Sequence, residues 1–499
     1  MADQISMQYQ YRPESDFELE VELKDHYVCR AWSKNIRMHT LETILPGRGA
    51  LDGLVFTPRL NGVYGTAHLL AAVQALEMIC GVTPPENATW VRTLALMVEH
   101  IQSDLRQSVL VFMKDYLNPV YANQPFYAEA QRRYQPFQGK SVVETLRMTK
   151  KLLEIIAVVG GQWPNSAFMV PGGISGKPSY NDLVTCRYIL SHFQKWYEER
   201  ILGCSLDRWQ QVQSEADLQR WMNEKETHFF NELGVFIRFA HLAKLHDYGR
   251  TAGNCISFPL MQQRDRKKLG GQEKLAILSE PVFLTHEATL PIDHAGIGQY
   301  VASTFCKDFP GCRHPFEGET VTSLQPYDSS KYSFDKAPRY NDQPAETGPL
   351  AEMLALGNPL FVDLVRRRGC NAYVRSLARL VRPAILLPIM QELVNQINSR
   401  DSYYTPVRGM PDGQGYGLIS ASKGALGHWL TVENECISHY QVVSPEIWNR
   451  SPRDQHGISG PCEDAVLGTK IDDPDNPVEL YHIIRSFDCC HSCSVHVRK

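Results

Sequence analysis

The chain has 499 residues, 43% of them hydrophobic and 10% aromatic, and its 51 basic and 55 acidic residues give a net charge of -4. This balance gives no electrostatic case for binding nucleic acid or an anionic membrane. No apolar run approaches the roughly 18 residues that a membrane helix needs, so we expect no direct membrane insertion. Thirteen irregularly spaced cysteines favour a reducing compartment. Because the acidic N-terminus lacks the apolar core of a signal peptide, we expect a cytoplasmic protein.

The first 90 residues predict a strand, a loop region and then helices. Residues 17–23 (FELEVEL) alternate apolar and acidic side chains, which predicts a strand with one buried face. Residues 38–68 hold many glycines and prolines, which predicts loops and turns. The apolar segment 68–82 predicts a helix. TPPE then predicts a capping box with Thr83 as N-cap and Glu86 at the third helical position.

Apolar spacing near 3.6 residues predicts helices along much of the remaining chain. They cover the stripe from Val91 to Phe112 and residues 140–158, 180–202, 217–245 and 370–399. A later hairpin is predicted from HWLTV (428–432) and CISHYQVV (436–443). We predict a mainly α fold with small β pieces (α+β), forming a single domain over residues 1–499.

The C-terminal stretch SFDCCHSCSVHVRK concentrates potential ligands: Asp488, Cys489, Cys490, Cys493 and His496. A lone C-x-x-C is compatible with half of a zinc site, a redox dithiol or reactive thiolates. The nearest other cysteines, Cys462 and Cys436, are not in C-x-x-C spacing. Any partner ligands therefore come from far away in the chain.

Seven segments occur in an order and spacing that point to one family. They are TPRLNGVYGTAH (57–68), GGQWPNSAFMVPGG (160–173), KAPRY (336–340), PAETGPLAEM (344–353), GALGHWLTVENECISHYQVVSPEIWNRSPRD, GPCEDAVLGTKI and SFDCCHSCSVH. Together they resemble the large, catalytic subunit of nickel-iron hydrogenases. The resemblance spans nearly the whole chain and implies that family's helical core.

The resemblance implies a metal centre held by two C-x-x-C pairs. Cys490 and Cys493 match the C-terminal pair, the first resembling the terminal nickel ligand and the second the thiolate that bridges nickel and iron. Where the family has its N-terminal pair, this chain has Asn61 and Tyr64. An amide oxygen and a phenol are hard, weak ligands for these metals. We therefore expect an altered iron or nickel centre, to which Cys489 either adds a third sulfur or, alternatively, simply packs or pairs with a neighbour.

Further matches carry the family's catalytic side chains and a second ion. Glu14 resembles the proton-relaying glutamate, Lys423 replaces an arginine above the metals, and Asp488 and Asp115 match carboxylates beside it. A planar guanidinium and a mobile ammonium are not equivalent. The resemblance also implies a magnesium or iron ion near the C-terminus, with these ligands: the side chains of Glu42 and His496 and the carbonyl of Val442.

The resemblance implies a redox metalloprotein, an oxidoreductase that works as a heterodimer with an iron-sulfur small subunit. The chain has no four-cysteine cluster motif, so iron-sulfur clusters are expected only in that partner. Export, where it occurs, would need a signal on the partner. Only three residues follow His496, so we expect no cleaved C-terminal extension. The alternatives are a catalytically silent, sensory or structural subunit with a repurposed pocket, and an ordinary hydrogen-oxidising hydrogenase.

Overall fold

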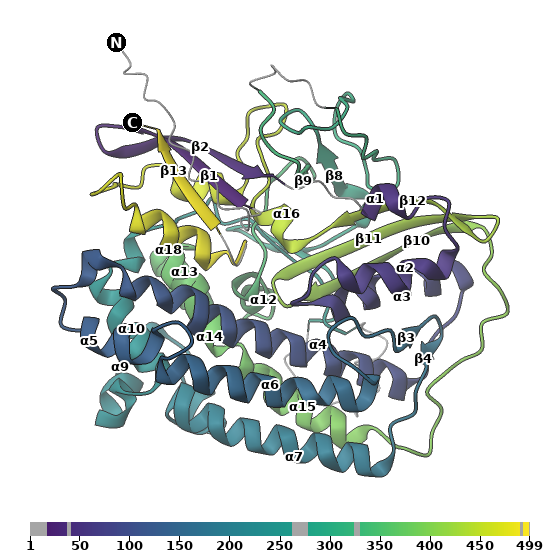
Figure 1. The fold of residues 1–499 in the computed structure, drawn as a ribbon, viewed down its shortest axis with the longest axis horizontal. Coiled ribbons are helices and arrows are strands. Elements are labelled where there is room, and N and C mark those ends of the chain that lie inside the picture. Colours follow the sequence, from purple (N-terminus) through teal and green to yellow (C-terminus); the bar gives the residue numbers. More distant parts are fainter. Residues whose placement is uncertain (1–16, 37–40, 262–277, 324–329, 490–492, 499) are drawn as a thin grey trace.

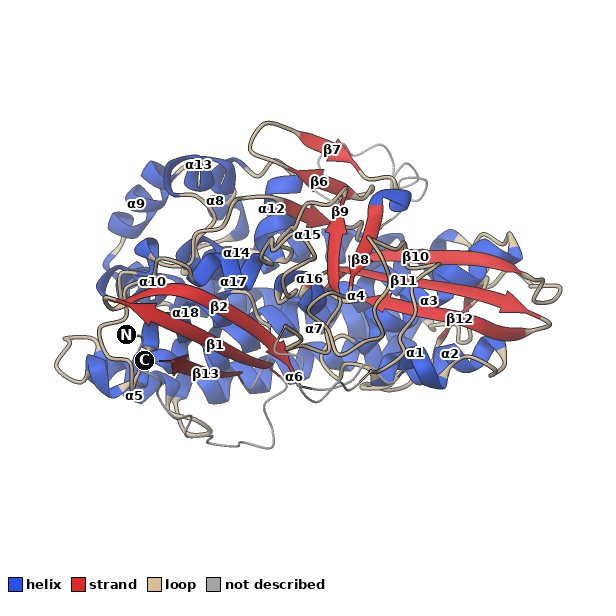
Figure 2. Ribbon diagram, turned by 90° about the horizontal axis from the view of Figure 1, so that it is seen from above, coloured by secondary structure: helices blue, strands red, loops and turns tan. Residues whose placement is uncertain are grey.

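The computed structural model describes residues 17–36, 41–261, 278–323, 330–489 and 493–498 (Figure 1). Helices are the predominant secondary structure, and small sheets lie along one side of them (Figure 2). This arrangement confirms the predicted mainly α fold with small β pieces. Within the described ranges, no helix is long and apolar enough to cross a membrane.

Five helices pack side by side in the lower half of Figure 1 and contribute many residues of the main hydrophobic core. Their bounds are α4 (Glu86–Arg106), α6 (Lys140–Gly160), α7 (Tyr180–Trp196), α14 (Ala372–Val381) and α15 (Pro383–Gln396). The predicted stripe on α4 is confirmed, because Val91, Leu94 and Ile101 are fully buried. Apolar burial at about 25 cal/mol per Å² is the main force that holds these helices together.

The other helices surround this layer. They are α1 (Leu41–Ile44), α2 (Gly53–Phe56), α3 (Gly65–Cys80), α5 (Tyr127–Tyr134), α8 (Leu206–Trp209), α9 (Glu215–Glu224), α10 (Glu232–Leu242), α12 (Pro349–Ala355), α13 (Pro359–Arg368), α16 (Pro445–Asn449), α17 (Pro461–Val466) and α18 (Val478–Ser486). Two of them, α1 and α2, lie in the segment predicted as loop.

Three helix predictions need correction. The predicted capping box is wrong, because Glu86 is the first residue of α4 and Pro85 precedes it in an extended conformation. Proline disfavours helical backbone angles in the residue before it. The helix therefore starts only after the Pro84–Pro85 pair. The predicted helix 217–245 is two helices, α9 and α10. The predicted helix 370–399 is likewise divided, at Pro383, which lacks the N–H needed to continue α14.

An antiparallel sheet contains the predicted hairpin. It consists of β10 (Gly413–Ala421), β11 (Gly424–Glu433) and β12 (Cys436–Val443), with a tight turn between the last two strands. Helix α3 lies directly on β10 because two glycines let the backbones approach. A Cβ at Gly415 would be 2.1 Å from the carbonyl oxygen of Ala75, and one at Gly417 would be 2.0 Å from that of Ala71.

The two ends of the described chain meet in a second sheet. Strand β1 (Phe17–Lys24), predicted from its alternation, pairs antiparallel with β2 (Tyr27–Asn35) and parallel with β13 (Cys493–Arg498). The register sets Phe17 beside Cys493 and Glu20 beside His496. The remaining strands form small sheets: β3 (Met169–Val170) with β4 (Gly173–Ile174), β5 (Cys255–Ser257) with β6 (Val282–Leu284) and β7 (Thr289–Pro291), and β8 (Ile297–Tyr300) with β9 (Ala337–Tyr340).

A fully buried arginine connects the helices of the core. Arg382, between α14 and α15, donates from Nε and Nη2 to both carboxylate oxygens of Asp104 on α4, at 2.8 and 2.9 Å. Its Nη1 donates to Glu352 on α12 at 2.7 Å, and Nη2 also donates to the carbonyl of Ser422. Burial nevertheless raises the pKa of Asp104 to about 6.

Removing this arginine should destabilise the fold. Arg382→Met leaves Asp104 and Glu352 buried without their shared cation, which costs about 3–5 kcal/mol. For 499 residues unfolding as one unit this corresponds to a fall of about 3–5 °C in the unfolding midpoint. Calorimetry measures the unfolding midpoint of this variant and of the control Arg366→Met, which replaces a side chain that is 74% exposed. Equal midpoints for the two variants would contradict the assigned role of Arg382.

Candidate functional site

A buried carboxylate, Glu446, gathers three of the predicted site residues. Nδ2 of Asn61 donates to Oε1 at 3.2 Å, and the hydroxyl of Tyr64 donates to Oε2. Nζ of Lys423 lies 3.3 Å from Oε1 and also 3.3 Å from Oδ1 of Asp488. The structure thus brings Asn61, Tyr64, Lys423 and Asp488 together around a residue that the sequence analysis did not single out. We call these five residues the Glu446 network.

Four local structures supply this network. Asn61 and Tyr64 lie in the turn before α3, which is tight enough that a Cβ on Gly65 would be 2.5 Å from the carbonyl oxygen of Pro58. Lys423 is in the two-residue turn between β10 and β11, and Glu446 is on α16. Asp488 follows α18 with a φ of 57°, a left-handed conformation that aspartate tolerates better than most residues.

The electrostatics of the network keep Tyr64 a neutral phenol. Burial and the adjacent charge of Glu446 raise the pKa of Tyr64 well above its usual range. For Glu446, burial acts to raise the pKa, but the ammonium of Lys423 and the hydrogen bond from Tyr64 outweigh it, and the pKa is lowered. The network is therefore a carboxylate held by an ammonium, a phenol and an amide.

The donors of Asn61 and Tyr64 do not fit the four-thiolate centre that the resemblance implies. Oδ1 of Asn61 accepts from the backbone N–H of Val63 at 2.9 Å, while its Nδ2 and the Tyr64 hydroxyl face Glu446. Soft metals such as nickel prefer thiolates to neutral amides and phenols. Half of the family's ligand set is thus replaced by groups that already have hydrogen-bond partners.

A chain of buried charges joins the Glu446 network to the core. Nη1 of Arg379, on α14, lies 3.0 Å from Oδ2 of Asp488 and 3.5 Å from Oδ1 of Asp104. Asp104 is in turn paired with Arg382. Acidic and basic groups therefore alternate without a break from Glu446 to Glu352. Such pairing is required, because an isolated buried charge costs several kcal/mol.

The structure describes the C-terminal cysteines only in part. Cys489 is buried, and its Sγ lies 3.1 Å from Sγ of Cys462. Burial and the neighbouring Cys462 raise the pKa of Cys489. Contact with a neighbouring thiol is one of the two roles expected for Cys489, and its role as a ligand stays a prediction. Cys490 and Glu14 lie outside the described residues, as does the side chain of Cys493.

Asp115 makes its ion pairs elsewhere. It lies in a 3-10 turn (Met113–Leu117) and pairs with Arg485 on α18, while Nδ1 of His482 is 3.6 Å from Oδ2. Its recorded partners are thus on α18, whereas Asp488 pairs with Lys423 and Arg379. The sequence resemblance grouped Asp115 with Asp488, and the structure places the two carboxylates in different ion-pair clusters.

The predicted second-ion residues are partly brought together. The backbone N–H of Val442 donates to Oε1 of Glu42 at 2.9 Å. In an antiparallel strand the N–H and C=O of one residue point to the same side, so the Val442 carbonyl also faces α1. Nζ of Lys336 lies 3.5 Å from Oε2 of Glu42 and donates to Thr320 at 2.7 Å. These oxygens suit magnesium, although an ammonium already neutralises the carboxylate. The side chain of His496 lies outside the described part.

A second polar group that the sequence analysis missed lies behind Tyr64. Glu99, on α4, accepts from the backbone N–H groups of Thr66 and Ala67 at the start of α3, and from the indole of Trp163 at 3.1 Å. Burial raises its pKa to about 7. Its neighbours one turn away on α4 include Gln102 and Ser103 as well as Ala95 and Leu96, so no local pattern marked it out.

Removing the Tyr64 hydroxyl tests the network. In Tyr64→Phe, Glu446 loses a donor and its pKa rises, which should lower stability at neutral pH by about 1.5–3 kcal/mol. In the wild type the lowered pKa of Glu446 stabilises the folded state. This stabilisation is fully present when the pH is above the ordinary pKa of glutamate, and it is lost as the pH falls through the lowered pKa of Glu446. The variant's deficit should therefore shrink on acidification. Thermal unfolding from pH 3 to 7 measures this. Tyr188→Phe, at a 66% exposed site, is the control, and a deficit independent of pH would contradict the assignment.

Glu99 should make stability fall as pH rises. The pKa of Glu99 is about 7 in the folded protein, against an ordinary value of 4.5. Between these two pH values the folded state therefore keeps a proton on Glu99 that the unfolded state has lost. The resulting cost grows from pH 4.5 to 7 and reaches about 3 kcal/mol. Glu99→Gln removes the titration, so its stability relative to wild type should rise across that window. Calorimetry at a series of pH values measures this difference in stability, with the surface variant Glu154→Gln as the control. If the stability of wild type and of Glu99→Gln changed with pH in parallel, the raised pKa of Glu99 would be refuted.

Comparisons with known proteins agree with the sequence resemblance. The family profile described as nickel-dependent hydrogenase matches residues 39–132 and 140–496. The chain is 27% identical over 530 residues to the periplasmic [NiFeSe] hydrogenase large subunit of Desulfomicrobium baculatum, covering 99% of this chain and 95% of that protein. It is 24% identical over 564 residues to the hydrogenase-2 large chain of Escherichia coli K12, covering 100% and 98%.

Solved structures share the fold. The H2-activated [NiFeSe]-hydrogenase from Dm. baculatum superposes with a TM-score of 0.79 at 24% sequence identity, and the match covers 97% of both chains. The [NiFeSe] hydrogenase of D. vulgaris Hildenborough in the reduced state gives a TM-score of 0.76, also at 24% identity, over 95% of both chains.

Proposed function

The chain belongs to the family of nickel-dependent hydrogenases, and we propose that within this family it is a redox metalloprotein with an altered metal centre. The observation that carries this proposal is the pairing of Asn61 and Tyr64 with Glu446, at the place of the family's N-terminal cysteine pair. These donors are hard, neutral and already hydrogen-bonded. They favour a centre that depends on the C-terminal cysteines.

In this proposal Cys490 and Cys493 hold an iron or nickel ion. Thiolates stabilise such metals in more than one oxidation state, so the ion would supply one-electron chemistry. Glu14 would move protons, as the family resemblance suggests. Lys423 and Asp488, 3.3 Å apart, would place a positive and a negative group beside bound substrate. Glu42, His496 and the Val442 carbonyl would hold magnesium near the C-terminus.

We further propose an iron-sulfur small subunit as the partner. The similar proteins from Desulfomicrobium baculatum and Escherichia coli are named a large subunit and a large chain, which supports a heterodimer. A cytoplasmic location stays a prediction. Because the relative from Desulfomicrobium baculatum is named periplasmic, the compartment needs its own experiment. Cell fractionation with antibodies to this chain decides it.

The second candidate is a silent or sensory subunit. It is favoured by the same Glu446 network, whose members contact one another through hydrogen bonds and ion pairs without a metal. Ordinary hydrogen oxidation is the third candidate, and the Asn61 and Tyr64 donors argue against it.

Metal analysis of the purified chain, separated from its iron-sulfur partner, distinguishes these candidates. We expect bound iron or nickel that is lost in Cys493→Ala and retained in Cys29→Ala, whose cysteine is exposed. Infrared bands from iron-bound cyanide and carbon monoxide would show that the family's iron unit is inserted. Hydrogen-dependent dye reduction should be absent.

Each contrary result favours a different candidate. A protein without transition metal that is unchanged by Cys493→Ala supports the silent subunit and overturns the altered centre. Dye reduction at ordinary hydrogenase rates overturns the argument from the Asn61 and Tyr64 donors.

A further inference from the structure

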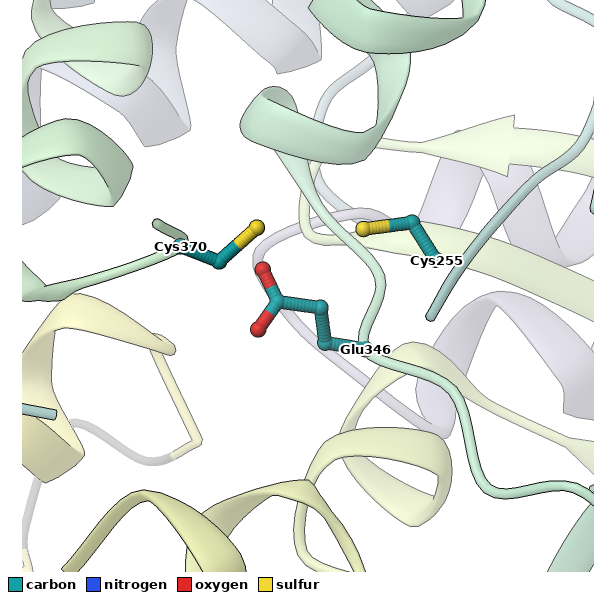
Figure 3. A group of neighbouring side chains, drawn as sticks. All are labelled: Cys255, Glu346 and Cys370. Carbon is teal, nitrogen blue, oxygen red and sulfur yellow. The ribbon is translucent and has the colours of Figure 1, made fainter. Parts of the chain in front are cut away.

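Three donor side chains converge in the core outside the Glu446 network: Cys255, Glu346 and Cys370 (Figure 3). One ligand atom from each lies within 4.8 Å of the other two. All three are buried, at 0%, 3% and 2% exposure. Figure 3 shows the two sulfurs pointing toward one another, with the carboxylate beside the gap between them. We call this group the Cys255 cluster.

The main chain fixes the relative positions of these residues. Cys255 opens β5, and Glu346 lies next to it in a parallel bridge. The N–H of Ile256 donates to the Glu346 carbonyl at 2.9 Å, and the N–H of Glu346 donates to the carbonyl of Asn254 at 2.9 Å. On the other side, the N–H of Thr251 donates to the carbonyl of Cys370 at 3.3 Å. The donors are thus held by backbone hydrogen bonds that do not depend on their side chains.

Outer partners orient the carboxylate. Oε2 of Glu346 accepts from Nη2 of Arg375 at 2.7 Å and from the hydroxyl of Thr251 at 2.9 Å. Among the described residues, Oε1 has only a longer contact of 3.3 Å with Nε of Arg375. One oxygen is therefore held by neighbours while the other is available to a ligand. Metal-binding carboxylates commonly have such hydrogen-bonded support.

We propose that Cys255, Cys370 and Glu346 bind a zinc ion as three of its four ligands, with water as the fourth. Zinc accepts thiolate and carboxylate ligands, and ligand atoms around a tetrahedral zinc lie about 3.8 Å apart, given Zn–S bonds of about 2.3 Å. Binding replaces the protons of the two thiols by one Zn²⁺ and releases both protons. The site then carries three negative groups, the two thiolates and the carboxylate, and one positive group, the guanidinium of Arg375. A divalent cation neutralises the remaining negative charge.

Charge balance agrees with this exchange. With both thiols protonated, the carboxylate of Glu346 is paired with the guanidinium of Arg375 at 2.7 Å. A coordinated thiol is deprotonated. The cluster is therefore free of uncompensated charge both with and without zinc.

The other buried cysteine pair differs from this cluster. Sγ of Cys462 lies 3.1 Å from Sγ of Cys489, shorter than the separation around zinc. Among the described residues, the Cys255 cluster is the one group of three such donors within ligand distance. The carboxylate of Glu346 gives the Cys255 cluster a third ligand of the kind that zinc accepts.

The position of the cluster suggests what the ion stabilises. The guanidinium of Arg375 lies over the ring of Phe487, 3.9 Å from its centroid. Phe487 directly precedes Asp488 of the Glu446 network. Zinc would join the start of β5, the segment at Glu346 and the start of α14 into one unit, on which the segment carrying Asp488 rests.

Zinc content of the purified full-length protein tests the proposal. The double variant Cys255→Ser/Cys370→Ser should hold one equivalent of zinc less than wild type. The matched control Cys186→Ser, equally buried but on α7, should not. Cys493→Ala should also keep this equivalent, which separates the cluster from the proposed redox centre. Replacement of zinc by cobalt should give thiolate-to-metal absorption bands that the double variant lacks.

A milder variant guards against loss of folding. Thr251→Val keeps all three ligands and removes one outer hydrogen bond, so zinc affinity in competition with a chromophoric chelator should fall about 10–100-fold. Equal zinc content in wild type and a folded double variant would overturn the proposal. A Cys255–Cys370 disulfide would also overturn it, if reduction followed by Zn²⁺ gave no complex.

Discussion

The need to pair every buried charge governs the centre of this protein. From Glu446 through Lys423, Asp488, Arg379 and Asp104 to Arg382 and Glu352, acidic and basic groups alternate. The series connects α16, the β10–β11 turn, the segment after α18, and helices α14, α4 and α12. Because one unpaired member would cost several kcal/mol, these elements hold fixed positions relative to one another. The site is thus built into the same interactions that hold the helices.

This constraint also limits what the site can bind. A ligand that enters between Tyr64 and Lys423 must replace hydrogen bonds and ion pairs that Glu446 already makes. A cation there would compete with an ammonium, while an anionic or polar molecule could exchange partners with Glu446. The family fold is thus kept while the turn before α3 carries Asn61 and Tyr64, whose hydrogen bonds to Glu446 are the basis of the altered centre that we propose.

Sequence patterns predicted the framework better than the contacts inside it. The buried stripe of α4, the strand at Phe17 and the β11–β12 hairpin follow from local periodicity, which the chain expresses without help from distant residues. Helix boundaries failed where prolines interrupt apolar periodicity, as at Pro85 and Pro383. The resemblance located Asn61 and Tyr64. It could not identify Glu446 as their partner, because hydrogen bonding between residues so distant in sequence leaves no local pattern. The Cys255 cluster was missed for the same reason.

The pairing of β13 with β1 has a consequence for how the protein is made. Phe17 and Cys493 are neighbours in the sheet but lie at opposite ends of the printed sequence. During translation β1 emerges early and can pair with β2, while its other edge stays open until nearly all of the chain has left the ribosome. An open strand edge invites pairing with other chains, and contacts of such long range form slowly. Closure of this sheet is therefore a late event in folding.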